Sequence, residues 1–266
     1  MRQEDEERAT ALLWDLGTAG IEVTPGKGER VVLLAYFAEA LPDREVAAAL
    51  APLPGARLEA APVPEVDWVA RFREGFRPFR VGRFRIAPSW APGEDGSDLL
   101  IVEPGAAFGT GTHETTRLCL AALEARAGEG PLGRVLDIGT GSGLLAVAAA
   151  KLGARLVIAL DLDPLALEAA RLHARLNRVE LRLLRADGGS PFRAGAFDTV
   201  LANLTAALLH ERRDEITRLR APGGALVLSG MLDEDARALT RAYAGRGRVE
   251  QRREGEWAAL VVGGER

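Results

Sequence analysis

The chain has little of the two residue types from which proteins build most transition-metal centres. Its 266 residues include a single cysteine, Cys119, and three histidines. One cysteine excludes an internal disulfide and any cysteine-based metal cluster. The histidines, His113, His173 and His210, are too far apart in the sequence for the usual spacing of metal ligands. The sequence therefore predicts no metal cofactor.

Long apolar segments are also missing. No stretch approaches an uninterrupted membrane span, and residues 1–8 are mostly charged where a signal peptide would be apolar. We therefore expect a cytoplasmic protein without a membrane contact. Lys27 and Lys151 are the only lysines, so arginine supplies nearly all the positive charge, and the net charge of −4 disfavours direct nucleic-acid binding.

The length suits one catalytic domain plus a smaller domain, and a hydrophobic fraction of 47% suffices for a proper core. The expected N-terminal elements are helices over 6–16 and 43–50 and strands over 20–24, 30–37 and 57–60. They predict a small α+β domain over residues 1–61. Prolines concentrate near residue 62, so we place a linker at 62–78 and a second domain at 79–266.

In the second domain, strand-like and helical segments alternate and end in two strand-like runs that flank Glu254-Gly255. The expected helices are 117–126, 144–153, 164–177, 206–219 and 234–243. This order predicts a mostly parallel, seven-stranded sheet with helices on both faces and an antiparallel hairpin at its end. That is the Rossmann-like α/β fold of class I methyltransferases.

The most informative segment is VLDIGTGSG at residues 135–143, which reads as a buried strand and a glycine turn. A helix and a second strand ending at Asp161 follow, a layout that holds a nucleoside cofactor at the carboxyl ends of strands. A dinucleotide fingerprint would require glycine where Leu144 stands, and the carboxylate of Asp137 would repel a diphosphate. S-adenosylmethionine has no phosphate and carries a sulfonium and an ammonium. We therefore expect S-adenosylmethionine rather than a nicotinamide cofactor.

Several residues in and after this unit have an expected role. Asp161 is placed to accept hydrogen bonds from both ribose hydroxyls, whereas Asp163 is expected to cap the next helix. Gly139 lets the backbone approach the methionine moiety, because a Cβ there would collide with the ligand. Asp187 either contacts adenine or belongs to a solvated turn. The cofactor contacts predicted in this unit are Asp137, Gly139, Gly141 and Asp161.

A loop rich in glycine and hydroxyl groups, residues 104–116, precedes the helix expected from Arg117. In one interpretation Thr115 or Thr116 simply caps that helix. In the other, the loop folds over the cofactor and a hydroxyl or amide near Thr116 contacts it. We favour the second, because a plain cap does not need so long a run of glycine and threonine. His113 is left without a role.

Asn203 follows the fourth strand of the domain, where class I methyltransferases place the group that meets the methyl acceptor. It either orients the acceptor or caps the next helix, and both roles are compatible. Enzymes that methylate adenine or glutamine nitrogens commonly place two prolines and an aromatic residue after this position. Here Leu204-Thr205-Ala206 follows, which favours an aliphatic amine. Asn203 is the predicted catalytic residue.

Several motifs together resemble the PrmA family, methyltransferases of the eleventh protein of the large ribosomal subunit. They are AFGTGTHETT at 107–116, DIGTGSG at 137–143, KLGA at 151–154, ANL at 202–204, SGML at 229–232 and GEW at 255–257. The similarity is strong over residues 65–262 and holds only in pattern over the first sixty.

The resemblance implies an N-terminal domain that grips the substrate protein and a class I catalytic domain. It implies methylation of an N-terminal α-amine and of lysine ε-amines, with S-adenosylhomocysteine as the product. By motif it places the cofactor contacts at Thr116, Gly139, Asp161 and Asn203. The implied partner is the ribosomal protein, free or on the ribosome.

Three alternatives stay open. One is a lysine methyltransferase of an electron-transfer flavoprotein subunit or another protein; the flavoprotein enzyme shares the same loop but would not need a ribosome-facing module. Another is a ribosomal RNA methyltransferase, disfavoured by the acidic balance and by Leu204-Thr205. The third is a cofactor-binding protein without catalysis.

Overall fold

The computed structural model describes residues 5–16, 18, 20–26, 30–37, 41–53, 55–59, 77–103 and 111–263. Contacts divide the chain into two units, Met1–Trp68 and Val69–Arg266. Each unit has a hydrophobic core of its own. Of the linker predicted at 62–78, only Arg77 and Pro78 lie within the described residues, so its boundaries stay a prediction.

The first unit pairs two helices with a two-stranded antiparallel sheet. Its elements are α1 (Glu6–Asp15), β1 (Gly20–Pro25), β2 (Val31–Tyr36) and α2 (Asp43–Leu50). Ala9 and Leu13 are one helical turn apart on α1 and pack with Val46 and Leu50 of α2. The small α+β unit is confirmed. The strand expected at 57–60 is wrong for residues 57–59, which are irregular, and Ala60 lies outside the described residues.

The second unit is built on a seven-stranded sheet in the order β11-β12-β10-β9-β6-β7-β8. Its strands are β6 (Arg134–Ile138), β7 (Leu156–Asp161), β8 (Arg182–Arg185), β9 (Phe197–Asn203), β10 (Arg220–Leu232), β11 (Arg248–Glu254) and β12 (Trp257–Gly263). β12 is antiparallel to β10 and β11, whereas the other neighbouring strands are parallel. The predicted mostly parallel sheet with a terminal hairpin is confirmed.

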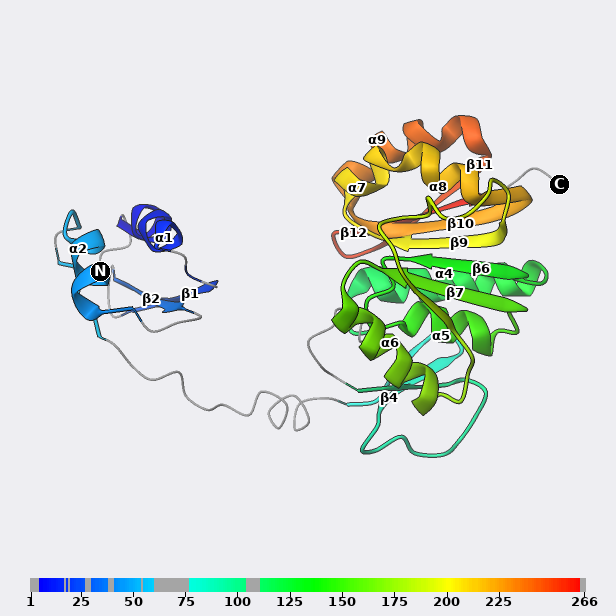
Figure 1. The fold of residues 1–266 in the computed structure, drawn as a ribbon, viewed down its shortest axis with the longest axis horizontal. Helices are drawn as coiled ribbons and strands as arrows, with labels where there is room; N and C mark the ends of the chain where they lie inside the picture. The colour runs from blue at the N-terminus through cyan, green and yellow to red at the C-terminus, as the bar shows by residue number, and fades with distance from the viewer. Residues whose placement is uncertain are drawn as a thin grey trace. The chain divides into compact units, whose positions relative to one another are not determined.

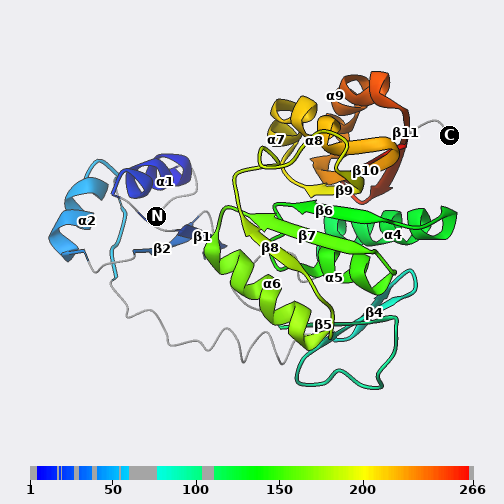
Figure 2. The ribbon, with the colours of Figure 1, turned by 45° about the vertical axis from the view of Figure 1, so that its right-hand side comes forward.

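Helices cover both faces of this sheet (Figures 1 and 2). One layer holds α4 (Glu114–Glu129), α5 (Leu144–Lys151) and α6 (Pro164–Leu176), and the other holds α7 (Ala206–Glu211), α8 (Arg213–Leu219) and α9 (Asp233–Tyr243). Side chains alternate along a strand, so Val135 joins the core beneath the first layer and Leu136 the core beneath the second. The single helix expected over 206–219 is interrupted at Arg212.

A second, three-stranded sheet packs on the outer side of the α5–α6 layer (Figure 2). It consists of β3 (Phe79–Val81), β4 (Phe84–Pro88) and β5 (Leu99–Val102), in that spatial order. Phe84, Ile86 and Leu100 are fully buried in the core shared with the α4–α6 layer. β5 leads into residues 104–110, which lie outside the described residues, and the described chain resumes at Gly111 just before α4.

The order of the strands positions the site. From β6 the chain moves to β7 and β8 on one side, then crosses over to β9 on the other side of β6. In parallel sheets ligands bind at such a switch point, outside the carboxyl ends of the strands. The segments after β6 and β9 therefore lie next to each other at this edge.

Close packing of α5 against α6 gives a first prediction. A Cβ on Gly143, which has φ +79°, would lie 2.7 Å from the Cβ of Ala170 on α6. Gly153 has φ +84°, but a Cβ there would meet nothing within 4 Å. We expect Gly153→Ala to lower the free energy of unfolding by about 1 kcal/mol, through left-handed strain alone.

Gly143→Ala should lower the free energy of unfolding by about 3 kcal/mol, because α5 and α6 must also separate. Urea denaturation of the two variants beside the unmutated chain measures both effects. Equal losses would contradict the close approach of Gly143 to Ala170.

Candidate functional site

The glycine turn between β6 and α5 lies at the carboxyl edge of the sheet, as the sequence predicts. Gly139, Gly141 and Gly143 all have positive φ, which glycine adopts without a steric penalty. The Gly141 N–H donates to Asp161 Oδ2 at 2.9 Å, and the Thr140 N–H donates to the carbonyl of Leu160 at 2.9 Å. The turn is therefore hydrogen-bonded to the end of β7.

Two backbone amides hold the carboxylate of Asp161. Oδ2 accepts from Gly141, and Oδ1 accepts from the N–H of Asp163 at 3.0 Å. Each carboxylate oxygen has a further lone pair, so both can still accept from hydroxyl groups of a ligand. Asp163 Oδ1 accepts from the Leu165 N–H at 2.8 Å, which confirms Asp163 as the cap of α6.

Asp137 lies beneath the turn and is only 1% exposed. Thr140 Oγ1 donates to its Oδ2 at 2.6 Å. Burial raises the pKa of this carboxyl to about 6, and the nearby charge of Asp161 acts in the same direction. A cation bound close by would favour the ionised form. The contact of Asp137 with the cofactor stays a prediction.

His113, to which the sequence assigned no role, is the N-cap of α4. Its Nδ1 accepts from the Thr115 N–H at 3.3 Å and lies 2.9 Å from Thr115 Oγ1. The interpretation of Thr115 or Thr116 as the cap is therefore wrong: both lie buried in the first helical turn. The imidazole packs edge-on against Trp257 of β12, with ring centroids 4.7 Å apart.

Asn203 is the last residue of β9, and its Nδ2 donates to Thr115 Oγ1 at 3.3 Å. The capping interpretation of Asn203 is wrong, because Thr205 is the N-cap of α7. Within the described residues, the buried Oδ1 of Asn203 and the buried Oγ1 of Thr116 have no hydrogen-bond partner. Buried polar atoms of this kind are rare and call for a ligand or water.

These two atoms belong to residues that line one cavity. It is open to solvent and is lined by Thr116, Gly139, Thr140, Gly141, Ser142, Leu144, Leu145 and Asn203. Four of the six predicted site residues are thus brought together: Thr116, Gly139, Gly141 and Asn203. Asp161 and Asp137 are not among the lining residues, but each accepts a hydrogen bond from one of them. Asp161 accepts from Gly141, and Asp137 accepts from Thr140.

Asp187 does not line this cavity. Its side chain is exposed and accepts a hydrogen bond from Arg212 Nη2 at 2.5 Å. The alternatives of an adenine contact and a solvated turn both stay open.

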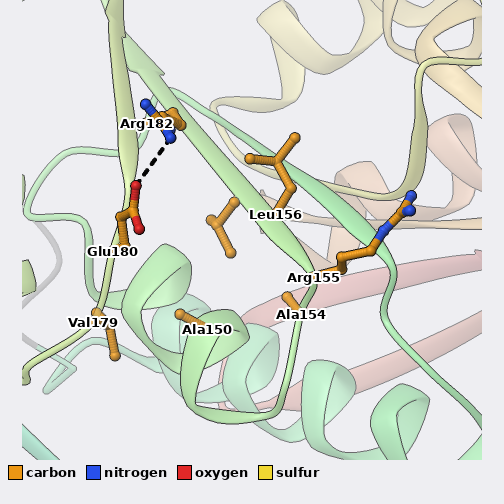
Figure 3. A pocket seen from close by; sticks show the side chains of 8 residues that line it. Ala150, Ala154, Arg155, Leu156, Val179, Glu180 and Arg182 are labelled. Carbon is orange, nitrogen blue, oxygen red and sulfur yellow. Dashed lines mark ion pairs between the residues drawn. The ribbon is translucent and has the colours of Figure 1, made fainter.

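A larger pocket lies at the opposite edge of the sheet (Figure 3). Figure 3 shows Leu156 from the start of β7 and the ion pair of Glu180 with Arg182, 3.1 Å apart, beside it. This pocket is at the amino ends of the strands, where parallel α/β sheets do not place their ligands. The candidate site is therefore the cavity at the glycine turn.

The described parts of the chain contain no cluster of three or more histidine, cysteine, aspartate or glutamate side chains that could hold a metal ion. They also contain no helix with the length and apolar character that crossing a membrane requires.

The mostly parallel sheet with its terminal hairpin, the glycine turn after β6 and the acid at the end of β7 define a class I S-adenosylmethionine-dependent methyltransferase. The family model for ribosomal protein L11 methyltransferase (PrmA) matches residues 2–264. The chain therefore belongs to the PrmA family.

Relatives and solved structures agree with this assignment. The chain is 43% identical to the ribosomal protein L11 methyltransferase of Geobacter metallireducens, over 76% of this chain and 70% of that one. It is 41% identical to the protein of the same name from Geobacter sulfurreducens, over 86% and 76%. The crystal structure of the ribosomal protein L11 methylase from Lactobacillus delbrueckii subsp. bulgaricus superposes with a TM-score of 0.65 at 29% identity. That match covers 72% of this chain and 100% of the other.

The buried carboxyl of Asp137 predicts a specific pH dependence of stability. With a pKa of about 6 in the folded chain and about 3.9 in the unfolded chain, the folded state binds more protons between these values. Stability from this group therefore falls as pH rises from about 4 to 6, by up to about 3 kcal/mol.

Asp137→Asn removes this dependence and keeps an oxygen that accepts from Thr140. Urea denaturation from pH 4 to pH 7 should show the variant gaining on the unmutated chain up to pH 6 and then running parallel to it. A difference that does not change with pH would contradict the raised pKa.

Proposed function

We propose that this chain transfers methyl groups from S-adenosylmethionine to amino groups of ribosomal protein L11, both the N-terminal α-amine and lysine ε-amines. One observation carries the proposal: glycine backbone, Thr116 and Asn203 line one cavity at the switch point of a PrmA-family fold, and Thr116 Oγ1 and Asn203 Oδ1 have no hydrogen-bond partner among the described residues. The name shared by the relatives supports the choice of acceptor.

The chemistry of the site suits S-adenosylmethionine, which carries a sulfonium and an ammonium and no phosphate. None of the described residues that line the cavity is charged, and Asp137 and Asp161, which are hydrogen-bonded to the glycine turn, are negative when ionised. In the proposal Asp161 holds the ribose hydroxyls and the backbone at Gly139 and Gly141 holds the methionine part. Thr116 Oγ1 supplies a further polar contact. When bound, S-adenosylmethionine supplies an electrophilic methyl group and leaves as S-adenosylhomocysteine.

Asn203 orients the attacking amine in this proposal. Because its Nδ2 donates to Thr115, its Oδ1 is the atom left to accept a hydrogen bond from the amine N–H. An amine attacks only in its neutral form, and a free lysine has a pKa of about 10.4. Partial burial at the cavity disfavours the ammonium form, so the proton leaves to solvent. The protein then contributes mainly position and orientation.

The first unit supports a role in gripping the protein substrate. Val32 and Leu34 on one face of β2 are 48% and 45% exposed, whereas Leu33 and Ala35 on the other face pack on the core. Exposed apolar side chains gathered on one face are typical of protein-binding surfaces. We therefore assign recognition of L11 to this face of β2.

An assay of methyl transfer tests the proposed function. The chain is incubated with labelled S-adenosylmethionine and purified L11, or with ribosomal RNA, and the products are analysed by mass spectrometry. We expect methylated amines on L11 and no methylated RNA. Asn203→Ala should lower kcat by about a hundredfold through lost orientation of the amine, while S-adenosylhomocysteine still binds.

Thr217→Val is the matched control, because Thr217 also carries a buried hydroxyl without a partner among the described residues but lies on α8, outside the cavity. It should leave kcat unchanged. Unimpaired turnover by Asn203→Ala would remove the proposed role of Asn203, and methylation of RNA alone would overturn the proposed acceptor.

Substrate recognition has a separate test. The double variant Val32→Ser, Leu34→Ser should raise KM for L11 about tenfold, because it removes apolar contact area from the binding face. Its kcat and its affinity for S-adenosylhomocysteine should not change. Leu156→Ser, an exposed leucine at the pocket of Figure 3, is the control and should leave KM unchanged. Equal effects of the two changes would contradict recognition by β2.

A further inference from the structure

Helix α6 carries two polar side chains in the core, one helical turn apart. His173 is 1% exposed and Asn177, at the C-cap of the helix, is 5% exposed. Burying such groups is unfavourable unless they are hydrogen-bonded, so their partners show what they do. Between them they contact β5, the glycine turn and the backbone of α6 itself.

Asn177 serves as a neighbour for the free edge of β5. Among the described residues β5 pairs with β4 alone, so its other edge has no strand partner in this part of the chain. Asn177 Oδ1 accepts from the Ile101 N–H at 2.8 Å, and Nδ2 donates to the Ile101 carbonyl at 2.7 Å. The side-chain amide thus makes the two hydrogen bonds to Ile101 that the backbone of a neighbouring strand would make.

His173 makes the next contact along the same edge. Four residues of helix rise about 6.0 Å and two residues of strand about 6.6 Å, so positions 173 and 177 match positions 103 and 101. The Glu103 N–H donates to His173 Nε2 at 2.8 Å. In this hydrogen bond Nε2 is the acceptor, so in the neutral ring Nδ1 carries the hydrogen. Nδ1 lies 2.6 Å from the carbonyl of Ser142 and donates to it.

One buried ring therefore joins the glycine turn of the candidate site to the end of β5. Ser142 belongs to the glycine turn and lines the cavity. Glu103 directly follows β5, on the chain that continues to α4 and Thr116. Asn177 ties the same helix to the same strand, but within the described part of the chain its side-chain hydrogen bonds go to Ile101 and His173 and not to the turn. Of these two side chains, His173 is the one that links α6 to the turn.

We propose that His173 is a positioning residue for cofactor binding: through the Ser142 carbonyl it sets the backbone of the glycine turn relative to β5. The inference rests on the proposed function in one respect, namely that S-adenosylmethionine is the ligand at this turn. His173 touches no ligand itself and acts through the backbone on either side of it.

The test is calorimetric titration of the full chain with S-adenosylhomocysteine. His173→Phe keeps an aromatic ring of similar size but removes the hydrogen bonds of His173 to the Ser142 carbonyl and from the Glu103 N–H. We expect binding at least about tenfold weaker than in the unmutated chain. In turnover assays KM for S-adenosylmethionine should rise while kcat at saturation is nearly retained.

Asn177→Leu is the matched control, because it breaks the β5 contact and leaves the turn alone. We expect its affinity for S-adenosylhomocysteine to stay within about threefold of the unmutated chain, even if its unfolding midpoint falls as far as that of His173→Phe. Equal losses of affinity in the two variants would show that His173 only stabilises the fold and would overturn the proposal.

A second pair of variants decides the question if His173→Phe does not fold. The amide of His173→Asn occupies the position of Nδ1 and can still donate to Ser142, whereas that of His173→Gln occupies the position of Nε2 and keeps the Glu103 contact. The proposal predicts tighter S-adenosylhomocysteine binding by His173→Asn. Equal affinities, or the reverse order, would contradict it.

Failure of this inference differs from failure of the proposed function. If the unmutated chain does not bind S-adenosylhomocysteine, the proposed cofactor is wrong, and the inference falls with it. If the unmutated chain binds it and His173→Phe binds it equally well, only the role of His173 is wrong.

Discussion

The turn from Gly139 to Gly143 is held by contacts on three sides, and the site is arranged around it. Gly141 donates to Asp161 of β7, the Ser142 carbonyl accepts from His173 of α6, and Gly143 lies against Ala170. These contacts set the direction of the backbone dipoles before any ligand arrives. Binding a nucleoside ligand there then requires little ordering of the protein, which favours affinity.

The other wall of the cavity depends on contacts between distant segments. Asn203 at the end of β9 donates to Thr115, and Thr115 is hydrogen-bonded to His113, whose ring packs against Trp257. Arg117 of α4 also pairs with Glu254 at 2.6 Å, at the end of β11. The C-terminal hairpin therefore supports the helix start that carries Thr116. This support keeps the Asn203 amide in one orientation.

Local patterns predicted the parts of the site that local physics determines. The β6–turn–α5–β7 unit and the Asp163 cap follow from residues close together in sequence, where apolar runs, glycines and capping side chains act directly. The cap of α4 was mispredicted because a histidine, rather than a hydroxyl, accepts the Thr115 N–H. The bonds of Glu103 with His173 and of Asn203 with Thr115 join residues that are 70 and 88 positions apart in sequence. No pattern in one sequence indicates such pairs.

The central claim is that S-adenosylmethionine or its product occupies the cavity at the glycine turn. Backbone amide resonances of the isotope-labelled chain, followed by NMR during titration with S-adenosylhomocysteine, locate the bound compound directly. The account predicts the largest shifts at residues 139–143, Asp161 and Asn203, and none from NADH at equal concentration. Shifts confined to the pocket of Figure 3, or a response to NADH alone, would contradict it.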